Sequence, residues 1–273
     1  MENYSVLMSV YYKEQPEYLR QSMQSVFEQT IPTDDFVLVC DGPLTEKLEA
    51  VIVEMQEQYP LILNVVRFEA NRGLGPALND GLLQCKNRLV ARMDSDDIAS
   101  PNRCELELSA FAQNNALSIV GGTIEEFEMN VENILSKKEM PEDHEDIVAF
   151  ARTRCPFNHP TVMYDKNLVI HSGGYPDLPL HEDYALWVNL LRNGAKTKNL
   201  KETLCYMRVD SGLYGRRGGL SYLKTAIKFR WHLYKIDFSG IFEVLYVICA
   251  LTLVCLVPTA LRKLIYKKAL RTK

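Results

Sequence analysis

Several common signatures are missing from this chain of 273 residues. Its seven cysteines are scattered and never form a Cys-x-x-Cys pair, which excludes a zinc ribbon or a disulfide framework and indicates reduced thiols in a cytosolic compartment. The first ten residues contain no basic stretch followed by a long apolar run, so we expect no signal peptide. No Gly-x-Gly-x-x-Gly follows the first predicted strand, and no nucleic-acid-binding motif is present. A Rossmann dehydrogenase and a nucleic-acid partner are therefore disfavoured.

The charge is unevenly distributed along the chain. The net charge is −4, but residues 1–195 carry −16 and residues 196–273 carry +12. The composition, 47% apolar and 24% charged, is that of a globular protein. An acidic N-terminal part and a basic C-terminal part indicate that the two parts have different partners. Because the basic part contains an apolar run, we expect its partner to be an anionic lipid surface.

Short apolar runs alternate with segments of helical spacing through the first hundred residues. The runs predict strands at Ser5–Tyr11, Phe36–Cys40, Leu63–Phe68 and Arg88–Met93, and the intervening segments predict helices at Pro16–Thr30, Thr45–Tyr59 and Gly75–Cys85. This alternation is typical of βαβ units in a mostly parallel α/β sheet. Ligands bind such sheets beyond the carboxyl ends of the strands.

Beyond Ser100 the pattern changes to mixed α and β structure. We expect a strand at Leu117–Phe127 with a bulge at Gly121-Gly122, a helix at Asp183–Asn193, and a late strand at Leu204–Val209.

Three carboxylates occur within four residues, at Asp94, Asp96 and Asp97, directly after a predicted buried strand. Their mutual repulsion is costly unless a cation neutralises it. Mg²⁺ and Mn²⁺ prefer oxygen ligands and accept diphosphate oxygens beside one or two carboxylates. The cluster therefore predicts a metal site for a nucleotide-diphosphate substrate, and a solvated acidic turn is the alternative.

Six motifs, in this order, carry a resemblance to a known family. They are Ser9–Glu14 (SVYYKE), Ser25–Thr30 (SVFEQT), Val39–Gly42 (VCDG), Asn71–Gly81 (NRGLGPALNDG), Ala91–Asp97 (ARMDSDD) and His181–Asp183 (HED). Over residues 4–215 the sequence resembles a family 2 glycosyltransferase, most of all the branch that assembles bacterial capsular, exopolysaccharide and O-antigen repeat units. The resemblance implies a GT-A fold, with residues 1–215 as the catalytic domain. It also implies a nucleotide-sugar donor and a lipid-linked saccharide acceptor.

The resemblance assigns the chemistry to two acidic motifs. Asp183 would be the general base that takes the proton of the acceptor hydroxyl, with Glu182 positioning donor or acceptor. Attack opposite the leaving group would invert the anomeric centre. Asp96, together with Asp94, would hold Mn²⁺ or Mg²⁺. From the residues alone, Asp183 is also a helix-capping residue, because it begins a predicted helix.

The resemblance also implies two binding sets. The nucleotide-sugar set is Val10, Tyr12, Glu14, Asp41, Arg72, Arg92, Asp94, Ser95, Arg216 and Arg217; the acceptor set is Asn158 and His159. Tyr12 would lie along the base and Asp41 would bond to it, whereas core packing and turn formation are their structural alternatives. Arg216 and Arg217 would close over the diphosphate or bind membrane phosphates. A structural role is the alternative for His159.

One departure from the family pattern concerns an arginine. Many relatives have Ala-Arg-Asn where this chain has Ala77-Leu78-Asn79. Either that arginine is dispensable, or Arg72 or Arg92 serves in its place.

The C-terminal segment, residues 216–273, predicts a membrane anchor. Leu220, Leu223, Ile227, Trp231 and Tyr234 fall on one face of a basic amphipathic helix, a pattern typical of helices that lie in the headgroup region. Val244–Leu261 then runs 18 residues without a charge, with basic residues on both sides. That length is near the lower limit for spanning a bilayer, and the basic flanks favour a re-entrant or in-plane hairpin over a crossing. We expect attachment to the cytoplasmic face of the cell membrane. A buried core helix is the alternative.

Two rival functions remain from the sequence. A nucleotidyltransferase that makes nucleotide-sugars would share the nucleotide-binding half and the acidic metal site, but would need neither Asp183 nor a membrane tail. An inactive membrane-bound scaffold of a polysaccharide assembly complex would not need the acidic motifs to be intact.

Overall fold

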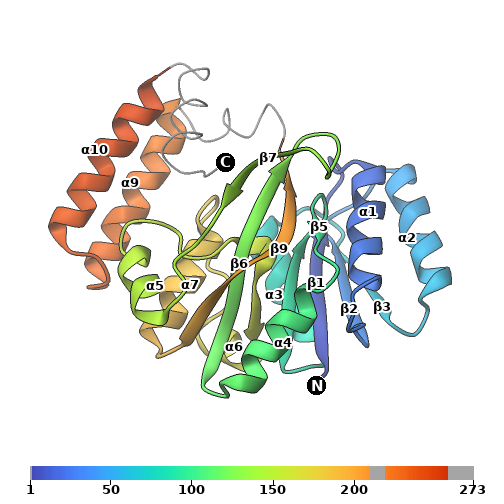
Figure 1. Cartoon of the computed structure of the whole chain (residues 1–273). Coiled ribbons are helices and arrows are strands. Elements are labelled where there is room, and N and C mark those ends of the chain that lie inside the picture. The colour runs from blue at the N-terminus through green and yellow to red at the C-terminus, as the bar shows by residue number, and fades with distance from the viewer. Residues whose placement is uncertain (1, 210–218, 258–273) are drawn as a thin grey trace.

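The computed structural model describes residues 2–209 and 219–257. Within this part, one sheet of nine strands lies at the centre, with helices on both faces (Figure 1). The strands are β1 (Tyr4–Val10), β2 (Asp35–Cys40), β3 (Leu63–Arg67), β4 (Leu89–Asp94), β5 (Ile98–Ala99), β6 (Leu117–Phe127), β7 (Ile134–Lys138), β8 (Met163–Asp165) and β9 (Lys196–Arg208). The helices are α1 (Pro16–Phe27), α2 (Glu46–Gln58), α3 (Leu74–Gln84), α4 (Arg103–Gln113), α5 (His144–Ala151), the short 3₁₀ helix η1 (His159–Thr161), α6 (Lys166–His171), α7 (Glu182–Arg192), α9 (Gly219–Lys235) and α10 (Ile241–Leu256).

The strand order is β3-β2-β1-β4-β8-β6-β9-β5, and β7 pairs with β6. β1 pairs in parallel with β2 and β4, and β2 in parallel with β3. Their carboxyl ends therefore meet at one edge of the sheet. β8 runs antiparallel between β4 and β6, which joins the parallel half to the second half.

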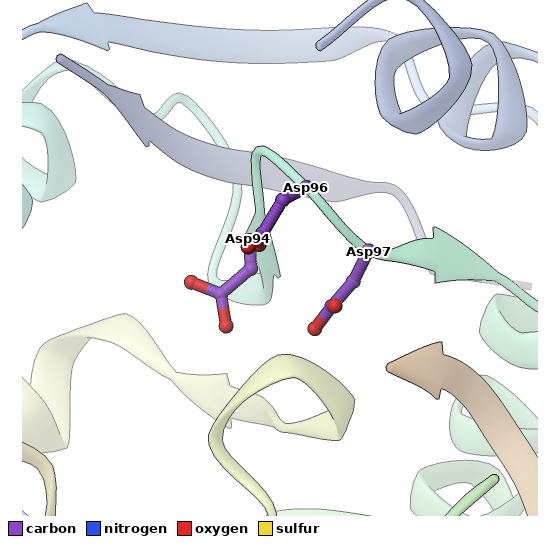
Figure 2. Close-up of side chains that lie close together, drawn as sticks. All are labelled: Asp94, Asp96 and Asp97. Carbon is purple, nitrogen blue, oxygen red and sulfur yellow. The ribbon is translucent and has the colours of Figure 1, made fainter. Parts of the chain in front are cut away.

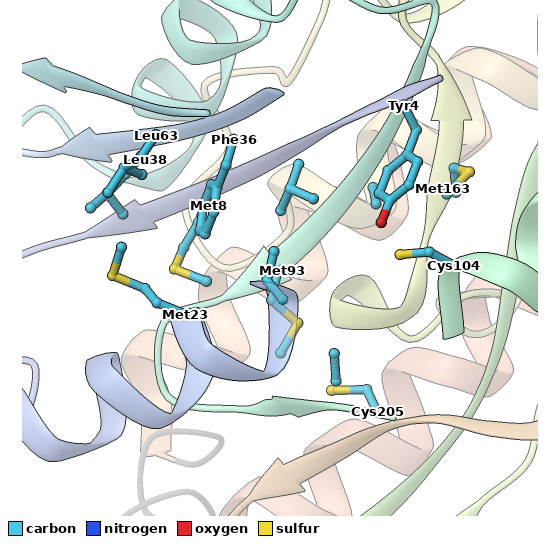
Figure 3. Close-up of a cluster of buried hydrophobic side chains, with 14 of the residues drawn as sticks. Tyr4, Met8, Met23, Phe36, Leu38, Leu63, Met93, Cys104, Met163 and Cys205 are labelled. Atoms are coloured by element: carbon cyan, nitrogen blue, oxygen red, sulfur yellow. The ribbon is translucent and has the colours of Figure 1, made fainter. Parts of the chain in front are cut away.

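Alternating residues of the parallel strands fill two cores. On β1, Val6 and Met8 pack toward one face and Leu7 toward the other. Figure 3 shows the first core, in which Met8 of β1 lies beside Met23 of α1 and Phe36 of β2. Because both faces are covered, these strands read as continuous apolar runs in the sequence.

The predicted α/β fold is confirmed for the first half of the chain, with element ends within a few residues of those expected. Thr45 is the N-cap of α2 and accepts a hydrogen bond from the amide of Leu48. The predicted late strand is longer than expected, because β9 begins at Lys196 and pairs along the whole of β6. The register between them shifts between Gly122 and Thr123. The unpaired residues there, Lys201 and Glu202, belong to β9, so the bulge predicted at Gly121-Gly122 is wrong in its strand.

The helices α9 and α10 lie side by side at one end of the molecule (Figure 1). The inner face of α9 packs on α7 through Phe229 and Leu233. Of the face predicted to be apolar, Leu223 is buried, and Leu220, Trp231 and Tyr234 are exposed. Contact of these exposed side chains with lipid stays a prediction. The face of α9 turned to the protein also includes Ala226 and Phe229.

Within residues 2–209 and 219–257, no helix combines the length and apolar character needed to cross a bilayer. Helix α10 accounts for the uncharged stretch as far as Leu256, and residues 258–261 of that stretch lie outside the described part.

Helix α3 packs closely on the sheet at Gly81, and a substitution there tests this packing. A methyl group there would lie 2.5 Å from Cγ2 of Val39 and 2.6 Å from Cδ1 of Leu7. Overpacking of this kind costs about 1–3 kcal/mol, whereas the gain in helix propensity from glycine to alanine is ~1 kcal/mol. We expect Gly81→Ala to lower the free energy of unfolding in urea. Leu83→Ala is the control, since Leu83 is exposed on the same helix and should change stability by less than about 0.5 kcal/mol. A Gly81→Ala variant as stable as the wild type would contradict this packing.

Candidate active site

The acidic turn of Asp94, Asp96 and Asp97 joins β4 to β5 at the carboxyl edge of the sheet. One carboxylate oxygen from each residue lies within 4.8 Å of the others. Figure 2 shows the side chains of Asp94 and Asp97 extending to the same side of the turn. Asp97 is 2% exposed, and its Oδ1 accepts a hydrogen bond from the amide of Arg208 at 2.8 Å. Asp97 thus fixes the turn to β9, which leaves Asp94 and Asp96 as the candidate ligands.

Burial and mutual repulsion change the proton affinity of these carboxyl groups. Burial, followed by the charges of Asp94 and Glu14, raises the pKa of Asp96 to about 7. Burial, followed by the charges of Asp96 and Asp94, raises the pKa of Asp97 well above its usual value. A divalent cation would relieve this repulsion, and an all-oxygen donor set suits Mg²⁺ or Mn²⁺. The residues present therefore fit such a metal.

Arg92 is the buried cation beneath the turn. It is 1% exposed and its Nη2 donates to Oδ1 of Asp94. Burial lowers the pKa of Arg92, but the charge of Asp94 and this hydrogen bond outweigh it and leave the pKa above its ordinary value. Nη2 of Arg103 donates to the carbonyl oxygen of Arg92 at 2.8 Å, which anchors the backbone of β4 beneath the site.

The second acidic motif begins α7. Oδ1 of Asp183 accepts from the amide of Tyr184 at 2.7 Å, and the thiol of Cys155 lies 3.8 Å from Oδ2 of Asp183. Burial raises the pKa of Glu182, whose Oε2 is buried without a hydrogen-bond partner among the described residues. Asp183 therefore bonds an amide of the first turn of α7, whose N-cap is His181. The other carboxylate of the motif, Glu182, is poorly solvated.

The charges of both acidic motifs reach Tyr175. The charges of Asp183 and Asp94 both act to raise the pKa of the Tyr175 hydroxyl, in the same direction as its burial and against the charge of Arg92. The charge of Arg92 also acts on Glu182. The fold thus brings the turn after β4 into contact with one buried arginine, and the start of α7 within reach of its charge.

Residues expected to bind the nucleotide gather at the ends of β1 and β2. Val10 is buried at the end of β1, and Tyr12 beyond it is 50% exposed, which leaves its ring accessible to a base. Oε2 of Glu14 accepts from Oγ of Ser95 at 2.8 Å, so Glu14 supports the acidic turn. Tyr12 is not packed in the core, which was its structural alternative.

The carboxylate of Asp41 holds the loop that precedes α3. Its two oxygens accept from the amides of Arg72 at 2.7 Å and Gly73 at 3.0 Å, and from Nδ2 of Asn71 at 2.9 Å. This is the turn-forming role that the sequence left open. Binding of a base by Asp41 stays a prediction.

Comparison with known proteins identifies the family. The model of glycosyl transferase family 2 matches residues 5–173. The chain is 37% identical over 270 residues to the UDP-Gal:alpha-D-GlcNAc-diphosphoundecaprenol beta-1,3-galactosyltransferase of Escherichia coli, with 98% of this chain and 96% of the relative covered. The chain belongs to glycosyltransferase family 2. This glycosyltransferase is also 39% identical over 225 residues to the amylovoran biosynthesis glycosyltransferase AmsE of Erwinia amylovora, covering 82% and 83% of the two chains.

The fold is similar to that of solved GT-A glycosyltransferases. The mannosyltransferase PcManGT from Pyrobaculum calidifontis, in complex with GDP-Man and Mn²⁺, matches with a TM-score of 0.65 at 17% identity, over 100% of this chain and 76% of that one. The GT-A-like fold predicted from the motifs is confirmed. The nucleotidyltransferase interpretation is set aside, because the matched relatives are named as glycosyltransferases.

The structure separates the two candidates for the missing arginine of this glycosyltransferase. Leu78, at the position where many relatives have arginine, is fully buried. Arg72 is exposed in the loop before α3 and pairs with Asp80 of that helix at 2.6 Å. Arg92 instead contacts Asp94 in the acidic turn. Arg92 is therefore the one of the two that is next to the proposed metal ligands.

The expected acceptor residues have structural partners. Asn158 is 3% exposed, and its Nδ2 donates to the carbonyl of Gly122 at 2.9 Å. Nε2 of His159 is 3.1 Å from the hydroxyl of Tyr175, and burial, followed by the charge of Arg92, lowers the pKa of His159 well below its usual value. A neutral His159 thus supports Tyr175 at the site. Arg216 and Arg217 lie outside the described residues.

Arg208 is a site residue that the sequence did not single out. Its Nε donates to the carbonyl of Asp96 at 3.0 Å, and its guanidinium lies 3.9 Å from the centroid of the Tyr18 ring. The only sequence signal is an arginine near the end of the predicted strand Leu204–Val209. Its pairing with the acidic turn depends on β9 lying beside β5, which no local pattern predicts.

The raised pKa of Asp96 predicts a linkage between pH, metal and stability. The folded protein keeps a proton on Asp96 up to about pH 7, whereas an aspartate in the unfolded chain loses its proton at about pH 3.9. The folded state therefore binds more protons in that window, and the free energy of unfolding falls as pH rises through it. Mn²⁺ requires the deprotonated carboxylate, so it should raise Tm more at pH 7.5 than at pH ~5.5.

Thermal unfolding of wild type and Asp96→Asn, with and without Mn²⁺, checks this linkage. The variant should lose most of the metal-induced rise in Tm. A residual pH dependence should persist, since burial also raises the pKa of Glu107 to about 7. An equal Mn²⁺ effect on both proteins would place the metal elsewhere.

Proposed function

We propose that this glycosyltransferase is an inverting, metal-dependent hexosyltransferase. It moves a hexose from a nucleotide-diphosphate sugar, a UDP-sugar, to a hydroxyl of a lipid-linked sugar in the synthesis of a bacterial surface polysaccharide. The observation that carries the proposal is the pair of acidic motifs that share the charge of buried Arg92: the turn containing Asp94 and Asp96, which Arg92 contacts, and the Glu182-Asp183 pair, on which its charge acts.

The donor and acceptor classes are supported by the relatives. The Escherichia coli enzyme is named for a UDP-Gal donor and a GlcNAc-diphosphoundecaprenol acceptor, and the similarity to it covers nearly the whole of both chains. The Erwinia amylovora enzyme is named for amylovoran biosynthesis. Similarity over this length supports the same classes of donor and acceptor for this chain, and leaves the particular sugar to experiment.

The acidic turn suits the leaving group. Asp96 and Asp94 would hold Mn²⁺ or Mg²⁺, which supplies positive charge to stabilise the departing diphosphate. Asp97, tied to the amide of Arg208, keeps the turn in place. Arg92 holds Asp94 from beneath and limits the net negative charge of the site.

Asp183 is the proposed general base. A carboxylate at this point removes the proton of the acceptor hydroxyl as its oxygen attacks the anomeric carbon, and the glycosidic bond to the diphosphate breaks on the opposite face. The anomeric configuration is thereby inverted. The amide of Tyr184 bonds to Oδ1 of Asp183 and the thiol of Cys155 lies beside Oδ2, and these two contacts orient the side chain for this task. Glu182, next to it, positions the reacting sugars.

The Asp183→Asn variant tests this function. Asparagine keeps the size and capping ability of aspartate but accepts no proton at neutral pH. We expect kcat to fall on the order of 10²–10⁴-fold with little change in donor affinity, measured as nucleoside diphosphate release over a panel of nucleotide sugars with a GlcNAc-diphospholipid acceptor.

Asp165→Asn is the matched control, because Asp165 caps α6 by accepting from the amides of Asn167 and Leu168. It should retain turnover. If Asp183→Asn also retained turnover per folded molecule, Asp183 would be a cap and not the base.

We propose further that the C-terminal segment attaches the enzyme to the cytoplasmic face of the cell membrane. Large apolar side chains are exposed on one stripe of α10, at spacings of three and four residues: Phe242 (84%), Leu245 (46%), Tyr246 (69%) and Leu253 (70%). Such a stripe is typical of a helix that lies in the plane of the interface. The exposed Lys224 and Lys228 of neighbouring α9 add attraction to anionic lipid. This arrangement supports the in-plane alternative.

Flotation with vesicles containing phosphatidylglycerol tests the membrane proposal. The double change Phe242→Glu and Tyr246→Glu should weaken binding at least tenfold, since burying each large apolar side chain contributes about 1.5–3 kcal/mol. Leu61→Glu is the control: Leu61 is 89% exposed, and we expect its replacement to leave binding unchanged. Equal binding of the double variant and the wild type would exclude α10 as the contact.

A further inference from the structure

Helix α9 contacts the residue that begins the catalytic motif. The ring of Phe229 stacks on the imidazole of His181, with centroids 4.7 Å apart and planes 9° from parallel. His181 is the N-cap residue of α7 and directly precedes Glu182 and Asp183. Phe229 also meets the ring of Tyr184 edge-on at 5.0 Å. One side chain of α9 therefore contacts the two residues that flank the Glu182-Asp183 pair.

Arg230 adds a polar connection at the same place. It is 8% exposed, and its Nη1 donates to the hydroxyl of Tyr184 at 2.9 Å. That hydroxyl donates in turn to the carbonyl of Ala151 at 2.6 Å. Because a buried charge requires a partner, this chain of hydrogen bonds fixes α9, α7 and α5 relative to one another.

No capping bond from its own side chain orients His181. The N-cap of α7 makes no side-chain capping bond, unlike Thr45 at the start of α2. Nε2 of His181 is buried without a hydrogen-bond partner among the described residues. Burial, followed by the charge of Arg230, lowers the pKa of His181 to about 4, so the ring is neutral at physiological pH. Ring packing on α9 therefore sets its position, through the stack on Phe229 and a looser contact with Tyr222, whose ring centroid is 6.2 Å away.

We propose that Phe229 and Arg230 of α9 are positioning residues for the Glu182-Asp183 pair, acting through His181 and Tyr184. The inference rests on the proposed function, in which Asp183 is the base. It makes α9 part of the catalytic unit, whereas the sequence assigned it to an appended anchor. A base displaced by about 1 Å loses on the order of 10²-fold in rate, so the stack sets turnover without touching substrate.

The test compares full-length variants of two buried residues of α9. Phe229→Leu keeps an apolar side chain but removes the stack on His181. We expect kcat to fall about 10- to 100-fold with the KM for donor within about threefold of wild type. Leu233→Ala is the matched control: Leu233 is fully buried in the same cluster, and its truncation should lower Tm at least as much while kcat, measured well below Tm, stays near the wild-type value.

Replacement of His181 gives the conservative rescue. His181→Ala should lower kcat to the level of Phe229→Leu. His181→Phe, which keeps a ring for stacking and loses only an unbonded nitrogen, should recover most of it. A kcat that follows Tm across Phe229→Leu and Leu233→Ala, or a failure of His181→Phe to recover activity beyond His181→Ala, would overturn the positioning role.

The Asp183→Asn variant separates this proposal from the one on which it rests. If Asp183→Asn is inactive and Phe229→Leu turns over like wild type, the positioning role is wrong and the base assignment stands. If Asp183→Asn remains active, both are overturned.

Discussion

The ion pair between Arg92 and Asp94 is the constraint on which the site depends. A guanidinium that is 1% exposed requires a charged partner, and Asp94 is that partner at the point where β4 leaves the sheet. Arg103, itself buried with Glu107, holds the backbone of Arg92 from the far side. The positive charge of Arg92 in turn acts on Asp96, His159, Tyr175 and Glu182. The metal side and the base side of the site are therefore tuned by the same buried cation. Replacing Arg92 would leave Asp94 without its ion-pair partner beside two further carboxylates.

The first half of the fold could be predicted because its strands are buried on both faces. Runs such as Phe36–Cys40 contain no polar interruption, and each is followed by a helix whose apolar spacing is unmistakable. The same reasoning placed the acidic turn at a strand end.

The second half of the fold could not be predicted in this way. β8 has three residues and β5 two, too few for a periodic pattern, and the pairing of β6 with β9 joins segments about 80 residues apart. Arg208 reaches Asp96 only through that long-range pairing, so its place in the site has no local signal.

The roles of individual site residues were harder to predict than their positions in the fold. The motifs placed Asp41 at the sheet edge correctly, but a sequence does not say which donors surround a carboxylate, and three donors of the following loop bond to this one. The partners of Asn79 were likewise not predictable from the sequence. Its side chain accepts from the amide of Tyr175 at 2.7 Å and donates to the Tyr175 carbonyl at 2.9 Å, which couples α3 to the segment before α7. The family motif Asn71–Gly81 therefore contributes to the base side of the site as well as to the nucleotide side. That coupling is visible only in three dimensions.

The C-terminal helices join the two proposed requirements of the enzyme, a membrane contact and a positioned base. Amphipathic spacing alone does not say whether an apolar face meets lipid or protein, since both bury the same side chains. In α9 the two faces are separate: Leu223, Ala226, Phe229 and Leu233 face the protein, whereas Leu220, Trp231 and Tyr234 are exposed. The proposed lipid contact includes α10, whose stripe from Phe242 to Leu253 has no cover among the described residues. Because α10 packs on α9 and α9 packs on the first turn of α7, a surface resting on the bilayer is connected through two helices to Asp183. An acceptor sugar carried on a lipid diphosphate stands at a fixed height above that bilayer. A rigid connection from lipid surface to base would hold the catalytic carboxylate at that height, which a flexible anchor would not do.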